Sequence, residues 1–403
     1  MANNNLDADF FKGNRQRLRE LANGLVGPII ITSAGRLQQS AHQAYEFFQD
    51  RYFWYLTGLD EANAILVIDG SDEYLILPSR SNYLDIFEGK IDKAKLSFMS
   101  GINDIHSYED GWQKLTDCYS NSTKIGSLLP MLDYIEDDQL YSNPSRRVLI
   151  DKLRQINDKF ELVDLRPILA KMRMIKQPAE IAAIRRAIQI TLETISDIEH
   201  AKKDFRFENE IEAEVLAGVR RRGAEGQAFY PVVASGERAC TLHYNDNNQA
   251  LSDKDLIVLD IGARFNHYVA DITRTIKFGD FSDRQLEIYN AVKEVQNYAI
   301  SLLRPGVMMS EYENDVRDFM GRKLIELGLK GDTKKYYPHL TSHFIGLDAH
   351  DVGNYDEPLA VGSVVTVEPG IYIAEEGIGV RIEDDILITD SGNEVLSKPN
   401  DHA

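Results

Sequence analysis

Two aspartates lie in segments whose other side chains are largely apolar. Asp260 belongs to the run Leu-Ile-Val-Leu-Asp-Ile at 256–261, and Asp271 follows eleven positions later, beyond a turn at Asn266-His267. Aspartate is depleted from strands, and burying an unpaired charge is costly. A hairpin around this turn would place the two side chains about opposite each other, with Cβ atoms roughly 4.5–5.5 Å apart. Because like charges at that distance repel unless a cation lies between them, the segment predicts a metal site.

Three residues of the same chemistry follow downstream. His343 lies in Ser-His-Phe-Ile-Gly, Glu368 closes the run Val-Val-Thr-Val, and Glu383 follows the strand-like Gly-Val-Arg-Ile. One imidazole and four carboxylates form a hard, oxygen-rich set that suits Mn²⁺, Fe²⁺, Co²⁺ or Zn²⁺. Five side chains exceed the needs of one catalytic ion, but they suit two ions bridged by shared carboxylates and a hydroxide.

A purely structural explanation would instead give each aspartate a buried cationic partner, for which Arg264 and Arg274 are candidates. Any one of the five residues alone would be weak evidence of a metal, whereas the five together favour the metal site. The sequence contains no G-x-S-x-G, P-loop, G-x-G-x-x-G or H-E-x-x-H motif, so other enzyme classes find no support.

The elements that must position these residues change character along the chain. In the first part, helical spacing at Phe10–Ala22 alternates with strand-like runs at Gly27–Thr32, Ala64–Ile68 and Tyr74–Leu77, which predicts an α/β domain. The pattern of predicted helices and strands changes near Asp164–Lys171. We therefore predict two domains, residues 1–168 and residues 169–403.

The second part combines long helices with β-rich segments that carry His, Asp and Glu, which indicates an α+β domain. Pro178 is typical of the first turn of a helix. The predicted helices are Ala179–Ala201, Glu208–Arg222, Asp283–Leu303 and Ser310–Leu327.

The composition is that of an ordinary soluble globular protein. Of 403 residues, 43% are hydrophobic and 27% charged, and the net charge of −19 argues against a general binder of nucleic acid or anionic membranes. No apolar run reaches the roughly 18 residues that span a bilayer, and the N-terminus lacks the pattern of a secretory signal. The two cysteines predict reduced thiols and therefore a cytoplasmic protein. From the charge and the lack of long apolar runs, we expect neither membrane nor nucleic-acid partners.

The segments around the five residues closely resemble the metallopeptidases of the pita-bread fold, over about residues 173–396. The match is carried by Ser235-Gly-Glu with Leu242-His-Tyr, by LDIGARFNHYVADITRT, SHFIGLDAHDVG, VEPGIYI and GVRIEDDILIT. The stretch DRYFWYLTGL at 50–59 resembles the creatinase-like N-terminal domain of the Xaa-Pro aminopeptidases, which methionine aminopeptidases usually lack. The resemblance implies an α/β creatinase-like domain followed by an α+β pita-bread domain.

The resemblance also implies a role for each site residue. Asp260 would bind one metal ion, Asp271 and Glu383 would bridge two, and His343 and Glu368 would complete the other. Glu368 would also shuttle a proton from the bridging water. The residues implied to stabilise the oxyanion and the leaving nitrogen are His243 and His350. Those implied to contact substrate beyond the cleaved bond are His339, Arg381 and Tyr372.

These features imply a dinuclear exopeptidase that cleaves short peptides with proline at the second position, with Mn²⁺ favoured over Zn²⁺, Co²⁺ or Fe²⁺. Phe229, Tyr230 and Tyr372 are candidate walls for the proline ring. Leu340 stands where many relatives have glycine, which leaves the preferred substrate length open. The resemblance further implies a homodimer or homotetramer.

Three alternatives share the fold. A prolidase, which cleaves only Xaa-Pro dipeptides, would use the same five ligands. A creatinase-like amidinohydrolase or a non-catalytic peptide-binding module would be expected to have lost ligands, whereas this chain keeps all five.

Overall fold

The structure is a computed structural model that describes residues 5–24, 27–120, 122–130 and 141–398. Its chain divides into two compact units, which meet at Ala170 and Lys171 within helix α8 (Arg166–Met174). No helix among the described residues is both long enough and apolar enough to cross a membrane.

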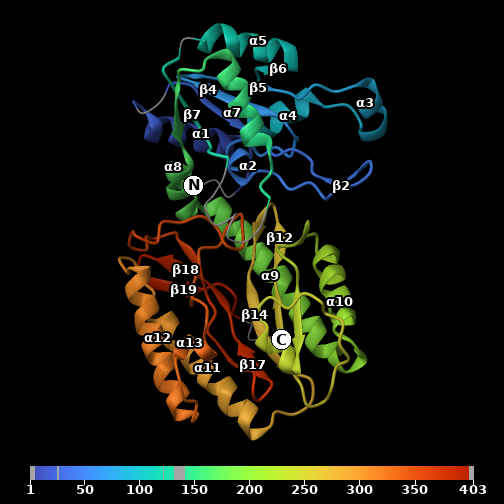
Figure 1. Cartoon of the computed structure of the whole chain (residues 1–403), viewed down its shortest axis with the longest axis vertical. Helices are drawn as coiled ribbons and strands as arrows, with labels where there is room; N and C mark the ends of the chain where they lie inside the picture. Colours follow the sequence, from blue (N-terminus) through green and yellow to red (C-terminus); the bar gives the residue numbers. More distant parts are fainter. Residues whose placement is uncertain (1–4, 25–26, 121, 131–140, 399–403) are drawn as a thin grey trace. The chain divides into compact units, whose positions relative to one another are not determined.

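The N-terminal unit is built on a six-stranded mixed sheet (Figure 1). Its strands are β1 (Ile29–Thr32), β4 (Ile65–Asp69), β5 (Asp72–Ile76), β6 (Ile105–His106), β7 (Lys124–Ser127) and β8 (Glu161–Asp164). They lie in the order β6-β5-β4-β1-β7-β8, with β1 antiparallel to β4 and parallel to β7. The strand-like runs predicted at Ala64–Ile68 and Tyr74–Leu77 correspond to the antiparallel pair β4–β5.

Helices complete this unit. They are α1 (Ala8–Ala22), α2 (Arg51–Thr57), α3 (Asn82–Glu88), α4 (Lys93–Ser100), α5 (Tyr108–Tyr119) and α7 (Ser145–Ile156). Leu115 of α5 and Leu149 of α7 pack with Ile30 and Val67 of the sheet in one apolar cluster. A short hairpin of β2 (Gln38–Ser40) and β3 (Gln43–Ala44) extends from the unit. The predicted α/β architecture is confirmed.

The C-terminal unit contains two groups of antiparallel strands. The first group is β9 (Gly226–Gln227), β10 (Val232–Ser235), β11 (Leu256–Ile261), β12 (Ala263–Phe265), β13 (Tyr268–Val269) and β14 (Ile272–Lys277). The second group is β15 (Val364–Val367), β16 (Gly370–Ile373), β17 (Ile378–Arg381), β18 (Asp384–Thr389) and β19 (Gly392–Val395). The sheets are β10-β11-β14, β13-β12-β9, β15-β18-β19 and β16-β17, as expected of an α+β domain.

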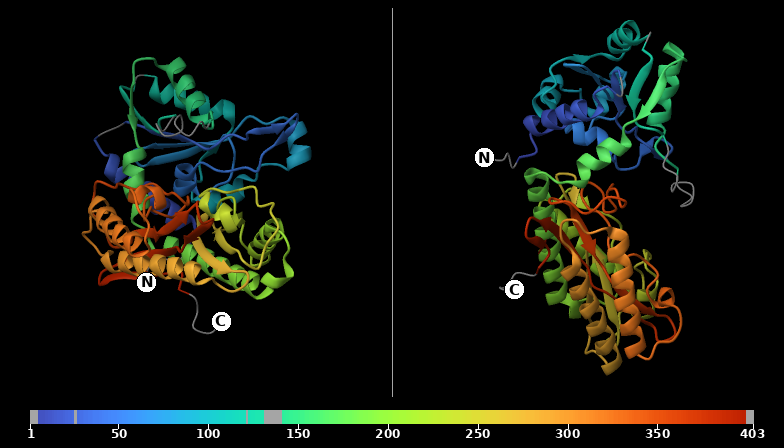
Figure 2. Two further views of the ribbon diagram at one scale, coloured as in Figure 1. Left: turned by 60° about the horizontal axis from the view of Figure 1, so that its bottom comes forward. Right: turned by 90° about the vertical axis from the view of Figure 1, so that its left-hand side faces the viewer.

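Long helices pack on the two groups of strands. They are α9 (Pro178–Ala201), α10 (Glu208–Arg221), α11 (Asp283–Leu302) and α12 (Met309–Glu326), followed by the short α13 (Thr333–Tyr336). The pair α9 and α10 packs on the first group, while α11 packs on the second and α12 lies beside α11 (Figure 2). Each of the four long helices begins and ends within two residues of its prediction, because Pro178 at the first turn of α9 and the capping box of Ser282 and Gln285 at α11 are local signals.

The register of β11 and β14 corrects one prediction. Asp260 lies opposite Thr273, not Asp271, and Ile261 lies opposite Ile272. The two aspartates are therefore diagonal neighbours on the same face, two positions out of register. The predicted opposition fails because the turn at Asn266-His267 pairs Phe265 with Tyr268 and Arg264 with Val269, and counting outward from that turn places Asp260 opposite Thr273.

Candidate metal centre

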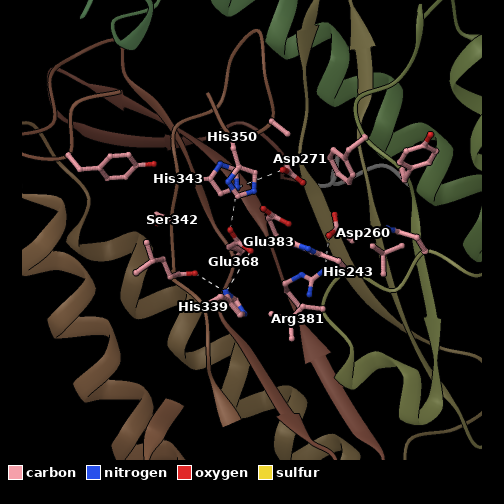
Figure 3. Close-up of a pocket in the computed structure, with 18 residues that line it drawn as sticks. His243, Asp260, Asp271, His339, Ser342, His343, His350, Glu368, Arg381 and Glu383 are labelled. Atoms are coloured by element: carbon pink, nitrogen blue, oxygen red, sulfur yellow. Dashed lines mark hydrogen bonds and ion pairs between the residues drawn. The ribbon is translucent and has the colours of Figure 1, made fainter. Parts of the chain in front are cut away.

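The five predicted metal ligands lie at or near the ends of strands in the C-terminal unit. Asp260 is on β11, Asp271 immediately precedes β14 and Glu368 immediately follows β15. Glu383 lies between β17 and β18, and His343 lies in the irregular segment before β15. All five face one cavity of about 520 Å³, although up to 123 residues separate them in the sequence (Figure 3).

Three of these residues form a compact set of donors. One ligand atom from each of Asp271, His343 and Glu383 lies within 4.8 Å of the others, and all three residues are buried. His343 Nε2 is 3.3 Å from Glu368 Oε1 and 3.8 Å from Asp271 Oδ2. The predicted convergence of carboxylates and imidazole is thus present.

The electrostatics of the cavity fit a cation. Burial and the neighbouring Glu383 raise the pKa of Asp271 well above its usual value, and burial and the negative charge of Glu368 raise that of Glu383. Burial opposes ionisation of Glu368 as well, but the hydrogen bond and charge of His343 outweigh it and lower its pKa. Bound cations would stabilise all the carboxylates in their ionised form.

Within the described part of the chain, two of the five predicted ligands have a buried carboxylate oxygen without a hydrogen-bond partner, Asp260 Oδ1 and Glu383 Oε1. Buried polar atoms normally have a partner, so orphaned oxygens in a cluster of acids are what a metal site requires. The donor set therefore fits divalent metal ions.

The structural explanation holds in part for Asp260, which has a buried cationic partner, although this partner is neither of the two candidates from the sequence. Asp260 Oδ2 is bound by Arg381 Nη2 at 2.6 Å, rather than by a cation from its own hairpin. Arg274 instead binds Asp384 at 2.7 Å. One oxygen of Asp260 is thus neutralised by Arg381 and the other is available for a ligand.

The residues predicted to contact substrate meet at one side of the cavity. His339 Nε2 lies 2.9 Å from the Tyr372 hydroxyl, which also accepts a hydrogen bond from Arg381 Nη1 at 3.0 Å. His339 and Arg381 line the cavity, whereas Tyr372 is buried and reaches it only through these two side chains. Phe229 and Tyr230 line the cavity as expected, and Leu340, which is half exposed, lies beside His339 at its edge.

The two remaining histidines lie at the mouth of the cavity. The ring of His350 stacks on that of His343, with centroids 3.9 Å apart and an interplanar angle of 11°. Loss of hydration and the charge of His343 lower the pKa of His350 to about 4. His350 is therefore neutral near pH 7 and offers one N–H. His243 faces the same space (Figure 3).

Sequence reasoning missed two groups that hold the ligands. The Thr273 hydroxyl donates to Glu383 Oε2 at 2.6 Å and accepts from Arg381 Nε at 3.1 Å. Asp385 Oδ2 accepts from the backbone N–H of Asp271 at 3.2 Å, and burial raises the pKa of Asp385 to about 8. One sequence signal could have found them. Thr273 lies two positions after Asp271 and Asp385 lies two positions after Glu383, and in an extended strand residues two apart point to the same face.

A buried ion cluster anchors the loop that carries His343 and His350. Asp351 is bound by Arg173 and, at 3.3 Å, by Lys176 Nζ. The backbone N–H of Asp351 also donates to the carbonyl of Phe344 at 2.8 Å, which closes the loop. No sequence signal links residues that lie 175 positions apart, so only the fold reveals this anchor.

Comparisons with known proteins agree with this geometry. Residues 182–390 match the sequence profile of metallopeptidase family M24, and residues 11–125 match that of the aminopeptidase P N-terminal domain. The chain is 36% identical to the Xaa-Pro aminopeptidase of Haemophilus influenzae, over 88% of this chain and 86% of the relative. It is 30% identical to the Xaa-Pro dipeptidase of Pyrococcus furiosus, over 83% and 86%.

Solved structures are also similar. Aminopeptidase P from Escherichia coli with the inhibitor Pro-Leu superposes with a TM-score of 0.84 at 31% identity, covering 98% of this chain and 95% of the other. The zinc-substituted form of that protein, in complex with product, has a TM-score of 0.82 at 31% identity and the same coverage.

Proposed function

The chain belongs to metallopeptidase family M24, and on that premise we propose that it removes the N-terminal residue of peptides with proline in the second position. The observation that carries the proposal is the convergence of Asp271, His343 and Glu383 in a cavity that His339 and Arg381 also line. The activity named for the Haemophilus influenzae relative, together with the N-terminal aminopeptidase P domain, supports this choice.

Two divalent cations would be held by Asp260, Asp271, His343, Glu368 and Glu383, with Asp271 and Glu383 shared between them. The oxygen-rich set and the resemblance noted above favour Mn²⁺. When bound, the cations supply positive charge that lowers the pKa of a water molecule and polarises a carbonyl group.

The protein's own groups would manage the protons. Glu368, whose pKa is held low beside His343, would accept a proton from the attacking water and pass it to the leaving proline nitrogen. His350 and His243 would donate N–H groups to the developing oxyanion and to the leaving nitrogen's side of the bond. The low pKa of His350 means that it donates as a neutral imidazole.

His339 and Arg381 would bind substrate on the C-terminal side of the cleaved bond, and Tyr372 would hold these two side chains in place. Their mutual hydrogen bonds at 2.9 and 3.0 Å hold the three side chains in one arrangement before substrate arrives. Phe229 and Tyr230 offer apolar surface without requiring an N–H from the proline nitrogen, which has none.

A matched pair of substrates tests this function. We expect an Xaa-Pro-Yaa tripeptide to be hydrolysed after its first residue in the presence of Mn²⁺, with the rate falling to background after chelation and returning when Mn²⁺ is restored. Chromatography of the released N-terminal amino acid measures the rate under each of these conditions. Cleavage that survives complete removal of metal would contradict the proposal.

The same experiment includes an Xaa-Pro dipeptide, because the Pyrococcus furiosus relative is a dipeptidase. Cleavage of the dipeptide alone would assign a prolidase. Cleavage of neither peptide by protein that binds stoichiometric metal would show that the fold is right and the substrate is wrong.

We further propose that the protein is a cytoplasmic homodimer or homotetramer. The N-terminal unit exposes Tyr83, Ile86 and Phe87 on α3, each at least 64% accessible, and apolar side chains gathered on one short helix favour association. We expect size-exclusion chromatography with light scattering to give a mass of two or four chains at micromolar concentration. A monomer mass throughout that range would exclude the assembly.

A further inference from the structure

The segment His339–His343 carries two site histidines without being a helix or a strand. One edge of it is hydrogen bonded to the strand that presents Glu368. The N–H of Glu368 donates to the Thr341 carbonyl, and the N–H of Thr366 donates to the His343 carbonyl, each at 2.9 Å. The segment therefore joins His339, His343 and Glu368 into one unit, whose position depends on what holds its other side.

The other side is held by helix α12. Both carboxylate oxygens of Glu313 accept the N–H of Thr341, at 2.8 and 3.0 Å, and Glu313 Oε1 also accepts the N–H of Ser342 at 3.0 Å. The Ser342 hydroxyl donates to the buried Tyr312 hydroxyl at 2.9 Å. Adjacent residues of one helix thus bind adjacent residues of the segment.

A carboxylate is well suited to this task. Two successive N–H groups without a strand partner must be satisfied elsewhere, and an ionised acceptor makes stronger and shorter hydrogen bonds than a neutral one. Burial raises the pKa of Glu313, and the N–H donors oppose that rise by favouring the charged form. Arg317, one turn further along α12, donates to the carbonyl of His339 at 3.4 Å.

We propose that Glu313 is a positioning residue for the reaction, which sets the locations of His339 and His343 by binding the backbone between them. The proposal rests on the proposed function for its role in substrate binding. Glu313 does not line the cavity, and its hydrogen bonds within the described part of the chain go to Thr341 and Ser342. It acts through the segment, because it binds Thr341, two residues after His339, and Ser342, the residue before His343.

Metal binding provides a readout that is independent of catalysis. Mn²⁺ would be titrated by calorimetry into metal-free wild type, Glu313→Ala, Glu313→Gln and Glu313→Asp. We expect alanine to weaken Mn²⁺ binding about tenfold, at the lower end of losses seen when the supports of metal ligands are removed. Glutamine retains one acceptor oxygen but brings an amide N–H against the backbone donors, so it should weaken binding nearly as much. Aspartate should restore part of the affinity.

Glu210 offers a matched control on α10. Its Oε2 accepts two successive backbone N–H groups, those of Arg206 at 2.5 Å and Phe207 at 3.2 Å, but it lies at the start of α10 and does not line the cavity. Glu210→Ala should lower the melting temperature while Mn²⁺ affinity and KM stay at wild-type values. The Glu313 variants should also show a raised KM for the tripeptide, because His339 is displaced together with His343.

The outcomes separate the two proposals. Wild-type Mn²⁺ affinity in folded Glu313→Ala would overturn the positioning role, whatever the substrate. Weakened Mn²⁺ binding in that variant, with no cleavage of either peptide by wild type, would support the positioning role and reject the proposed function. Equal losses of Mn²⁺ affinity in Glu210→Ala and Glu313→Ala would reduce Glu313 to a general contributor to stability.

Discussion

Replacing Glu383 with glutamine is expected to reduce peptide hydrolysis at least ~1000-fold, which corresponds to about 4 kcal/mol of activation free energy. The carboxylate is 1% exposed, with Oε2 bound by the Thr273 hydroxyl and Oε1 left without a partner. Glutamine has nearly the same shape but lacks the negative charge that Glu383 would share between the two cations. Steady-state kinetics on the tripeptide, with metal content measured on the same sample, checks the effect.

The fold of this variant should survive. In the metal-free protein, burial and the charges of Glu368 and Asp260 raise the pKa of Glu383 and disfavour its ionised form, so a neutral side chain fits the site at least as well. The melting temperature of metal-free Glu383→Gln should therefore equal or exceed that of the wild type. Glu383 is a cleaner test than Asp260, because Asp260→Asn would also remove the ion-pair partner of Arg381.

A surface carboxylate supplies the control for Glu383. Glu394 is 44% exposed in its side chain and pairs with Arg185. Glu394→Gln should leave both turnover and metal content at wild-type values. Turnover near that of the wild type in Glu383→Gln would remove the two-metal mechanism.

Asp351→Asn is expected to cause the largest loss of stability, about 3–5 kcal/mol in the free energy of unfolding. The side chains of Arg173, Lys176 and Asp351 are exposed by 2%, 0% and 1%. Removing the charge of Asp351, the buried carboxylate that both cations contact, leaves Arg173 with the partly exposed Asp348 and takes the ion-pair partner from the buried Lys176. Burial already lowers the pKa of Lys176, against the pull of Asp351. Urea unfolding, monitored at the transition of the C-terminal unit, measures the loss in the free energy of unfolding.

Asp348 provides the comparison within the same cluster. Its carboxylate lies 3.0 Å from Arg173 but is 41% exposed, so Asp348→Asn should cost less than about 1 kcal/mol. A loss in Asp351→Asn no greater than that in Asp348→Asn would show that the cluster does not anchor the loop. Activity should fall in Asp351→Asn even at temperatures where it remains folded, because His350 is the preceding residue.

Local signals in the sequence were enough to predict the helices and to identify the candidate metal ligands. Helix boundaries such as Pro178 at the start of α9 followed from caps and from apolar spacing, which are local properties. The five candidate ligands were recognisable because Asp260 and its counterparts interrupt or close apolar strands, where an unpaired charge is expensive. Their identities also carried the resemblance, which the match of residues 182–390 to family M24 confirms.

How these residues come together depends on contacts between elements that are far apart in the sequence. The pairing of Asp260 with Arg381 joins strands 121 residues apart, whereas the diagonal placement of Asp260 and Asp271 follows from the local turn at Asn266-His267. The supports of the histidine segments, Glu313 on α12 and Asp351 with its two cations, form from contacts between distant parts of the chain. Periodicity and residue type report which side chains are buried, but the partner of a buried charge is set by the packing of whole elements against one another.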